Sequence, residues 1–271
     1  MVVVSLWEDL ELSLRLDEVA FGYPGHTVGA AASFELHSGE VLCFLGPNGC
    51  GKTTLFKTIL GLIDLQAGAV YLDDRSTSSC SQMHLARAIA YVPQQHDAYF
   101  PFTVLEVVMM GRSPHLGLFK SPTRHDEAIA DAMLNQLNIG HLREEIYTRV
   151  SGGERQLTLI ARALAQEPRI LIMDEPTTNL DFGNQIKVLA QIKNLARQGI
   201  SIIISTHDPD HAFQCADRVA MLKGGSIIAV GKPAEILTDD ALQVLYDVRV
   251  KVMEVRIPHL HKLRRICIPL N

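Results

Sequence analysis

No segment of this sequence is long and apolar enough to cross a membrane as a helix. A membrane span takes about 20 mostly apolar residues, whereas the most apolar runs, Ile170–Met173 and Ile200–Ile204, are far shorter and are closed by polar or charged residues. The mean hydropathy of +0.13 therefore indicates buried strands rather than a membrane anchor. Glu8 and Asp9 stand where a signal peptide would carry positive charge, so we expect no export signal and a cytoplasmic location.

Paired cysteines and an excess of basic residues are also missing. The five cysteines are an odd number without close spacing, which argues against a disulfide framework or a metal-ligand motif and fits a reducing compartment. The formal net charge of −5 argues against a protein whose main role is to coat nucleic acid, so we expect no nucleic-acid partner. With 47% hydrophobic residues among 271, the chain can bury one large core, alone or with a sizeable insertion.

Short β-branched runs alternate with segments of helical periodicity, which is typical of an α/β fold with a largely parallel sheet. Strands are predicted most strongly at Val41–Leu45, Ile170–Met173 and Ser201–Ser205. Alternating leucines in Leu12–Leu16, together with Val70–Leu72, predict an antiparallel β layer near the N-terminus.

Two further segments have recognisable patterns. Between about residues 99 and 150 the pattern is helical, and Ile129, Met133 and Leu137 form one apolar face that we interpret as core packing. Arg218–Leu222 and Ser226–Val230 flank a Lys-Gly-Gly turn, which predicts a hairpin, and Pro233 then suits the first residue of a short helix. The basic tail, residues 256–271, is expected to be loosely docked or disordered, without a chemical role.

A phosphate-binding loop follows the first buried strand. The segment matches G-x-x-x-x-G-K-[ST] and is followed by the helix-forming run Thr54–Leu60. Glycines let the backbone approach phosphates closely, and the amide N–H groups at a helix N-terminus attract anions. Lys52 offers a positive charge to the β- and γ-phosphates, and the Thr53 hydroxyl can coordinate Mg²⁺. The loop consists of Gly46, Pro47, Asn48, Gly49, Cys50, Gly51, Lys52 and Thr53, and Thr54 joins it as a nucleotide-binding candidate.

Two adjacent carboxylates, Asp174 and Glu175, follow the strand Ile170–Met173. Asp174 at the strand tip can hold magnesium directly or through water. Glu175 would face the γ-phosphate and orient or deprotonate the attacking water. Alone, the pair could mark a loop boundary or a helix N-cap; with the phosphate loop present, the catalytic interpretation is favoured.

The segment Val150-Ser151-Gly152-Gly153-Glu154 resembles the signature of the ABC ATPase family, a Leu-Ser-Gly-Gly-Gln-like sequence before a helix. Val150 and Glu154 depart from that pattern, whereas Ser151, Gly152 and Gly153, which meet phosphate in the family, are intact. Physically they form a second helix-mouth anion site.

Other residues match the family in order along the chain. Tyr23 is similar to the aromatic that stacks on adenine, although a strand-end core aromatic is the alternative. Gln94 resembles the glutamine that senses magnesium and water, and Asp181, in Asn179-Leu180-Asp181, resembles the loop that crosses to the partner subunit. His207 resembles the switch histidine that contacts the γ-phosphate, against the alternative of a structural histidine at a strand end.

The resemblance implies an ABC-type P-loop nucleotide-binding domain: α/β, with a mixed sheet core, an N-terminal antiparallel β layer and an inserted α-helical subdomain. The domain would span residues 12–248, with the helical subdomain at about 99–165 and a tail at 249–271. The implied activity is ATP hydrolysis with Mg²⁺. Because the Ser-Gly-Gly segment of this family completes the site of the opposite copy, the resemblance also implies a homodimer that closes on two ATP.

The segment from Met110 to Phe119, with Pro122 and Asp126, is similar to motors of the iron-chelate and vitamin B12 importer branch, which also includes molybdate and tungstate relatives. That likeness implies polytopic permease subunits, an extracytoplasmic substrate-binding protein and a peripheral position on the cytoplasmic face of the inner or plasma membrane. We expect an iron-chelate cargo of siderophore, haem or cobalamin type. The segment from Phe100 to Gly117 would accept a permease helix, with Phe100, Phe102 and Leu118 as contacts or, alternatively, core residues.

The main alternative is a soluble ABC ATPase of iron–sulfur assembly or DNA repair. Repair members insert long coiled coils or zinc modules between the phosphate loop and Ser-Gly-Gly, and none is evident here. A smaller hypothesis concerns Cys50. Its place at a helix N-terminus favours a lowered thiol pKa and inhibition by alkylation, against the alternative of a small residue that merely fits.

Overall fold

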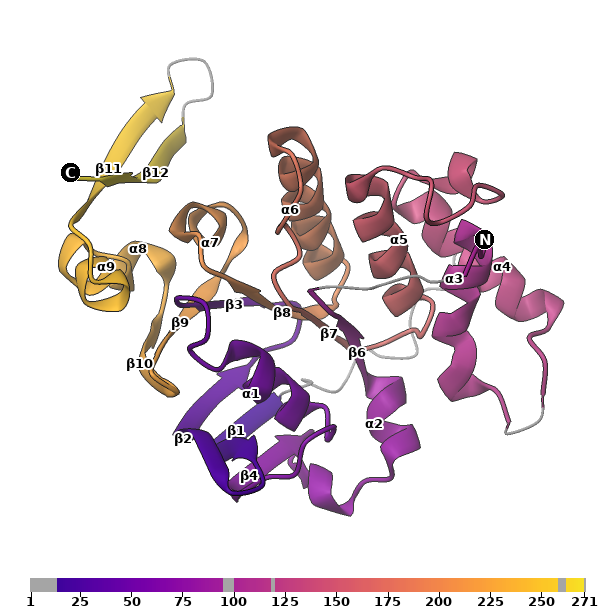
Figure 1. The fold of residues 1–271 in the computed structure, drawn as a ribbon, viewed down its shortest axis with the longest axis horizontal. Helices are drawn as coiled ribbons and strands as arrows, with labels where there is room; N and C mark the ends of the chain where they lie inside the picture. The colour runs from indigo at the N-terminus through magenta and orange to yellow at the C-terminus, as the bar shows by residue number, and fades with distance from the viewer. Residues whose placement is uncertain (1–13, 95–99, 118–119, 258–261, 271) are drawn as a thin grey trace.

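A computed structural model describes residues 14–94, 100–117, 120–257 and 262–270 of the chain. Its centre is a six-stranded sheet in the order β10-β9-β3-β8-β7-β6, in which β9, β3, β8, β7 and β6 run parallel and β10 is antiparallel to β9 (Figure 1). The strands are β3 (Val41–Leu45), β6 (Ile89–Val92), β7 (Ile170–Met173), β8 (Ser201–Thr206), β9 (Arg218–Lys223) and β10 (Ser226–Gly231). This mixed core confirms the predicted fold class, including the hairpin around the Lys-Gly-Gly turn.

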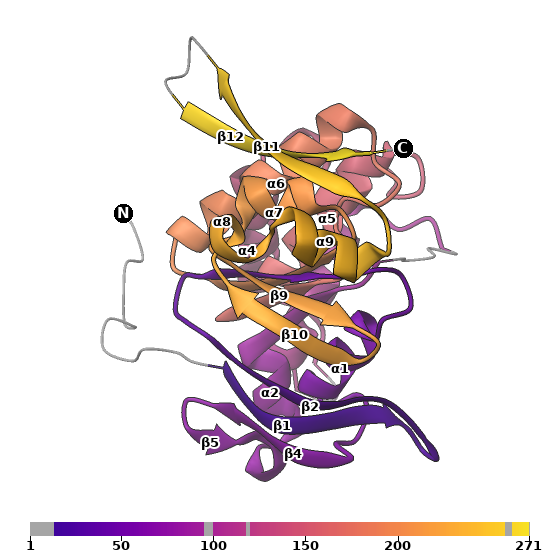
Figure 2. The ribbon, with the colours of Figure 1, turned by 90° about the vertical axis from the view of Figure 1, so that its left-hand side faces the viewer.

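The N-terminal β layer is a second, antiparallel sheet in the order β2-β1-β4-β5. Figure 2 shows it as a separate layer beside the central sheet, with α1 and α2 nearby. Its strands are β1 (Leu14–Tyr23), β2 (His26–Leu36), β4 (Ala67–Leu72) and β5 (Arg75–Ser76). The first strand begins at Leu14, and the predicted Leu12 lies outside the described residues.

Each central strand contributes to two cores, because successive side chains point to opposite faces of a sheet. On β3, Val41, Cys43 and Leu45 pack with the helices of one face, whereas Leu42 and Phe44 pack toward β1 and α1. The covering helices are α1 (Lys52–Ile59), α2 (Gln82–Ala88), preceded by the 3₁₀ turn η1 (Thr77–Ser79), α6 (Phe182–Arg197) and α7 (Pro209–Cys215).

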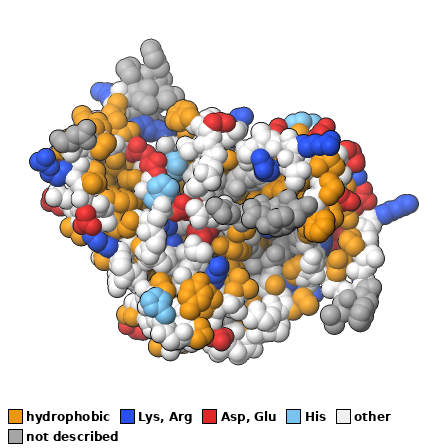
Figure 3. All heavy atoms as spheres, viewed as in Figure 1, with side chains coloured by type: hydrophobic (Ala, Val, Ile, Leu, Met, Phe, Trp, Pro, Cys, Tyr) orange, Lys and Arg blue, Asp and Glu red, His pale blue; other side chains and the backbone are white. Residues whose placement is uncertain are grey.

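The helical part forms one side of the molecule (Figure 1), and hydrophobic side chains gather on part of its surface (Figure 3). Ala130 and Leu134 are fully buried and Leu137 nearly so, in agreement with the predicted core face, while Ile129 and Met133 pack at its margin. The elements are α3 (Val104–Met109), η2 (Met110–His115), α4 (Arg124–Gln136), η3 (Gly140–Leu142) and α5 (Gly152–Leu164).

A buried arginine fastens the segment that follows α3. Arg112 Nε donates to Asp126 Oδ1 at 3.0 Å, and Nη1 donates to the Ala165 carbonyl and to Glu167 Oε2, both at 2.7 Å. The hydrogen bonds from Thr123 and Arg112 hold the pKa of Asp126 well below its usual range, so the pair stays charged. Arg112 therefore joins η2 to the start of α4 and to the end of α5.

The described part of the C-terminal tail is ordered, and the expectation of a loose or disordered segment is wrong for these residues. After α8 (Pro233–Ile236) and α9 (Asp239–Tyr246), strands β11 (Val250–Ile257) and β12 (Lys262–Pro269) form an antiparallel hairpin that packs on α7. One of the basic residues that suggested disorder is paired, because Arg265 forms an ion pair with Glu254 at 2.8 Å. At the start of the hairpin, Lys251 forms a second ion pair with Asp239 at 2.6 Å. Within the described residues, no helix has the length and apolar character that a membrane crossing would need.

Candidate functional site

The phosphate loop lies between β3 and α1, and its glycines occupy conformations that other residues rarely adopt. Gly49 and Gly51 have φ of 79° and 106°, in the left-handed region. Gly51 is the N-cap of α1 and offers no side chain to its first N–H groups. The helix mouth is therefore left open to an anion, which fits a phosphate.

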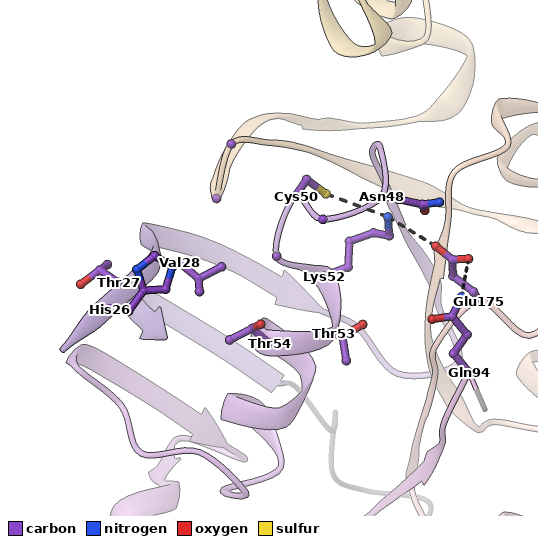
Figure 4. Close-up of a pocket in the computed structure, with 14 residues that line it drawn as sticks. His26, Thr27, Val28, Asn48, Cys50, Lys52, Thr53, Thr54, Gln94 and Glu175 are labelled. Atoms are coloured by element: carbon purple, nitrogen blue, oxygen red, sulfur yellow. Dashed lines mark hydrogen bonds and ion pairs between the residues drawn. The ribbon is translucent and has the colours of Figure 1, made fainter. Parts of the chain in front are cut away.

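Lys52 lies buried beneath the loop. Its Nζ donates to the carbonyl oxygens of Gly46 at 2.7 Å and Pro47 at 3.1 Å, and it lies 3.6 Å from Glu175 Oε1 (Figure 4). The ammonium thus stands between the loop and the carboxylate, where an incoming anionic ligand can exchange for these contacts.

Parallel strands bring the other candidates to the same edge of the sheet. The phosphate loop follows β3, Asp174 and Glu175 follow β7, His207 follows β8, and Gln94 lies two residues beyond β6. Because the carboxyl ends of parallel strands share one edge, residues far apart in sequence meet there.

Asp174 is fixed by three hydroxyl groups. Thr53 Oγ1 donates to its Oδ2 at 2.5 Å, Tyr91 Oη donates to the same atom at 3.4 Å, and Ser205 Oγ donates to Oδ1 at 2.5 Å. Burial and the Asp174 charge raise the pKa of Tyr91, so its hydroxyl remains a donor. Thr53 and Asp174 thus place hydroxyl and carboxylate oxygens side by side, and oxygen atoms of this kind are the ligands that Mg²⁺ prefers.

Glu175 collects contacts from three directions. Its Oε2 accepts from Gln94 Nε2 at 3.1 Å and Thr178 Oγ1 at 2.9 Å, and lies 3.3 Å from His207 Nδ1. Its φ of 47° is in the left-handed region, and the Ser205 hydroxyl accepts its N–H at 2.9 Å. A strained, buried carboxylate held in this way is typical of a functional position.

A cleft of about 720 Å³ contains many of the predicted residues (Figure 4). It is lined by Asn48 to Thr54, Gln94 and Glu175, and also by two segments that the sequence analysis missed. These are His26, Thr27 and Val28 on β2, and Gly224 and Gly225 in the β9–β10 turn. The turn lies against the phosphate loop because the Gly225 N–H donates to the Cys50 carbonyl at 3.1 Å. The sequence predicts the turn itself, but it does not reveal that the turn contacts the phosphate loop.

Several predicted nucleotide contacts do not line this cleft: Gly46 and Pro47 at the start of the phosphate loop, and Ser151, Gly152, Gly153 and Asp181 farther along the chain. Ser151 is the N-cap of α5, and its hydroxyl and N–H both donate to Glu154 Oε2, at 2.7 and 2.8 Å. These hydrogen bonds lower the pKa of Glu154. Glu154, one of the two residues that depart from the family pattern, is therefore a charged member of the capping box of α5. Asp181 is the N-cap of α6, where its side chain accepts the Asn184 N–H at 2.9 Å.

Tyr23 is also absent from the cleft lining. It ends β1 opposite His26, and 46% of its surface is exposed. The alternative of a core aromatic is therefore wrong for this residue. An accessible ring beside a lining residue is compatible with stacking on a base, and that role remains a prediction.

The hypothesis of an activated Cys50 thiol is wrong. Cys50 is buried, and burial raises its thiol pKa more strongly than the Lys52 charge and the backbone hydrogen bonds lower it. The mouth of α1 therefore does not make this thiol a thiolate at neutral pH.

We expect iodoacetamide to label Cys50 slowly near pH 7. The rate should rise about tenfold per pH unit up to about pH 9, because the thiolate is the reacting form and its pKa is raised. Peptide mass spectrometry gives the rate, and a Cys50→Ser variant identifies the peptide. Labelling that is equally fast at both ends of this range would contradict the prediction.

The described residues fit a nucleoside triphosphate. The open helix mouth and Lys52 suit its phosphates, and the cleft has room for a nucleotide. A Cβ at Gly46 would lie 2.2 Å from the Leu222 carbonyl oxygen, so the backbone there packs too closely for any other residue.

Comparison with known proteins gives consistent matches. The family model described as ABC transporter matches residues 30–178. An uncharacterised ABC transporter ATP-binding protein of Haemophilus influenzae is 44% identical, covering 86% of this chain and 89% of that protein. The hemin import ATP-binding protein HmuV of Rhodococcus jostii is 36% identical, covering 90% and 82%.

A solved structure is similar over nearly the whole chain. It is an ABC transporter, described as of metal-chelate type and captured in an inward-facing conformation. It is 31% identical, covers 96% of this chain and 98% of its own, and has a TM-score of 0.86.

Proposed function

Because this chain belongs to the ABC transporter family and is an ATPase of that family, we propose that it powers a membrane importer of a metal chelate. The observation that carries the ATPase chemistry is the set of contacts around Glu175: Lys52 on one side, Gln94 and His207 on the other. The import function and the cargo class rest on the relatives, two of which are described by hemin import and by the metal-chelate type.

Each residue at the sheet edge has a proposed role in hydrolysis. Glu175 accepts the proton of the attacking water, and Gln94 orients that water. Lys52 binds the β- and γ-phosphates, and His207 contacts the γ-phosphate. Thr53, Asp174 and Gln94 would hold Mg²⁺, which supplies charge neutralisation on the phosphate oxygens when it is bound.

We place the second half of each nucleotide site on another copy of the chain. Ser151 and Gly152 are exposed at the mouth of α5, away from the cleft of their own chain, and Asp181 begins α6 nearby. Next to Asp181, Phe182 leaves 79% of its surface exposed. A second helix mouth for anions beside an exposed aromatic ring suits an interface that closes over ATP in a homodimer.

The permease contact is proposed on the helical part. Phe100 and Phe102 are 66% and 38% exposed, with ring centroids 5.9 Å apart, so the alternative that they are core residues is not supported. Met110 is also exposed, and it is the first residue of η2, the segment that Arg112 fastens. Leu118, the third predicted contact, lies outside the described residues. A polytopic permease, with an extracytoplasmic binding protein, would position the chain on the cytoplasmic face of the membrane.

A pull-down from solubilised membranes of the source cells tests this proposal. We expect a tagged Glu175→Gln protein with ATP to recover a polytopic membrane protein in near-equal amount. Adding Phe100→Ser and Phe102→Ser should reduce recovery at least about fivefold, because the apolar contact surface is lost. Mass spectrometry of the eluate gives the amounts.

Ile228→Ser is the matched control, because Ile228 is an exposed apolar residue on β10, in the central sheet. It should leave recovery unchanged. Recovery of soluble proteins alone would overturn the importer proposal and favour the soluble alternative, while the ATPase assignment would stand. A partner permease specific for an oxyanion such as molybdate would overturn only the cargo class.

A further inference from the structure

His207 lies in the loop that joins β8 to α7, and the His207 side chain is 50% exposed. Its Nδ1 nevertheless lies 3.3 Å from Glu175 Oε2. Few neighbours restrain a half-exposed side chain, so its direction depends on the backbone from which it leaves.

That backbone is held at a single peptide unit. The carbonyl oxygen of His207 accepts a hydrogen bond from Tyr246 Oη at 2.8 Å. The N–H of the same peptide, which belongs to Asp208, donates to Thr206 Oγ1 at 3.0 Å. Because a peptide unit is planar, two bonds at its opposite ends fix its orientation.

Tyr246 comes from the C-terminal part of the chain and is itself well anchored. It ends α9, whose Leu242 and Leu245 are fully buried. Lys223, the last residue of β9, donates to Asp247 Oδ1 at 2.8 Å and to the Val244 carbonyl. Burial raises the pKa of Tyr246, so its hydroxyl keeps its proton and can donate.

The C-terminal hairpin of β11 and β12 contacts both the helix that follows His207 and the helix that carries Tyr246. The Cys267 N–H on β12 donates to Asp210 Oδ1 at 2.8 Å, in the first turn of α7. The Val252 N–H on β11 donates to Asp239 Oδ1 at 2.7 Å, in the first turn of α9. The hairpin therefore ties the helix that follows His207 to the helix that carries Tyr246.

We propose that Tyr246 is a positioning residue for ATP hydrolysis: its hydroxyl fixes the His207 peptide and thereby aims the imidazole at the γ-phosphate side of Glu175. This inference rests on the proposed role of His207. It also gives the C-terminal hairpin, which lies in the tail expected to have no chemical role, a part in supporting the hydrolytic step.

Tyr246→Phe removes only the hydroxyl, and the ring keeps its packing. We expect kcat to fall about fivefold, the size of effect that one net hydrogen bond has on a barrier, with KM for ATP within about twofold of the wild-type value. In NMR spectra of histidine-labelled protein, the His207 ring resonance, identified by its loss in His207→Ala, should shift. Tyr71→Phe on β4, where the ring packs on Arg15, is the control and should change neither quantity.

A double variant separates positioning from a general structural effect. In the His207→Ala background, whose slow hydrolysis is measured at high enzyme concentration, adding Tyr246→Phe should cause no further loss. A further fall in kcat in the double variant, as large as the fall that Tyr246→Phe causes alone, would overturn the positioning role. So would a wild-type kcat for Tyr246→Phe alone. Full hydrolysis by His207→Ala would instead overturn the proposed role of His207 itself, and the inference with it.

Discussion

A Glu175→Gln variant should bind ATP normally and hydrolyse it about 10²- to 10⁴-fold more slowly than the wild type. The amide has the size of the carboxylate and can still accept from Gln94 and Thr178, but it cannot take a proton from water. It also removes the charge that lies 3.6 Å from Lys52 Nζ, so the ammonium is freer to bind phosphate. Phosphate release measures the rate, and calorimetry measures ATP affinity.

ATP should also convert this variant into a stable dimer, because in the proposed homodimer nucleotide that is not cleaved would continue to hold the two copies together. Size-exclusion chromatography with and without ATP detects the change. Glu235→Gln, the same substitution at an exposed position in α8, is the control and should hydrolyse ATP at the wild-type rate. A Glu175→Gln rate within about threefold of wild type would show that Glu175 is not the general base.

The second large effect is expected for Gly152→Asp. A Cβ at Gly152 meets only Leu180 Cδ2, at 3.7 Å, which is an ordinary contact, so the fold should tolerate the side chain. The new carboxylate would stand in the first turn of α5, where it stabilises the helix but repels a phosphate. Hydrolysis should fall by about 10² or more, the scale for losing one preorganised charge-stabilising group, whereas ATP should still bind to the phosphate loop. Gly153 is a poorer choice, because a Cβ there would lie 2.3 Å from Asn184 Cγ.

Mixing two inactive variants tests whether the sites are shared between copies. A Lys52→Met chain has a defective phosphate loop and an intact Ser151 segment, and a Gly152→Asp chain has the reverse. Each alone should be nearly inactive. An equimolar mixture should regain roughly a quarter of wild-type hydrolysis, because half of the randomly formed dimers contain one complete composite site of two. No recovery, with dimers demonstrably mixed, would mean that each chain uses its own α5 mouth.

The sequence was most informative where a function depends on local geometry. The phosphate loop needs glycine at positions such as Gly51, whose φ is 106°, and it lies directly between a strand and a helix. Asp174 and Glu175 follow an unmistakable buried strand. Such features can be predicted from sequence because they depend on residues that are adjacent in the chain.

Features that depend on distant neighbours were missed or misjudged. The cleft wall from His26 to Val28 belongs to the other sheet, and the turn at Gly225 meets the phosphate loop through a contact that no local pattern reveals. Cys50 was assigned a lowered thiol pKa from its helix mouth, but burial by surrounding elements reverses the direction. The basic composition of the tail suggests a loose or disordered segment, but β11 and β12 pair as a hairpin in which Arg265 forms an ion pair with Glu254.

By itself, then, the sequence determined the ABC-type fold, the order of the motifs and the residues available for phosphate and magnesium, because dihedral preference and strand periodicity act over a few residues. Only the tertiary structure decided how those residues meet. The sheet brings the ends of β3, β6, β7 and β8 to one edge, and Tyr246 reaches the His207 carbonyl from 39 residues away. Hydrogen bonds and burial of this kind depend on distance in space, and that distance is settled only when the whole core has packed.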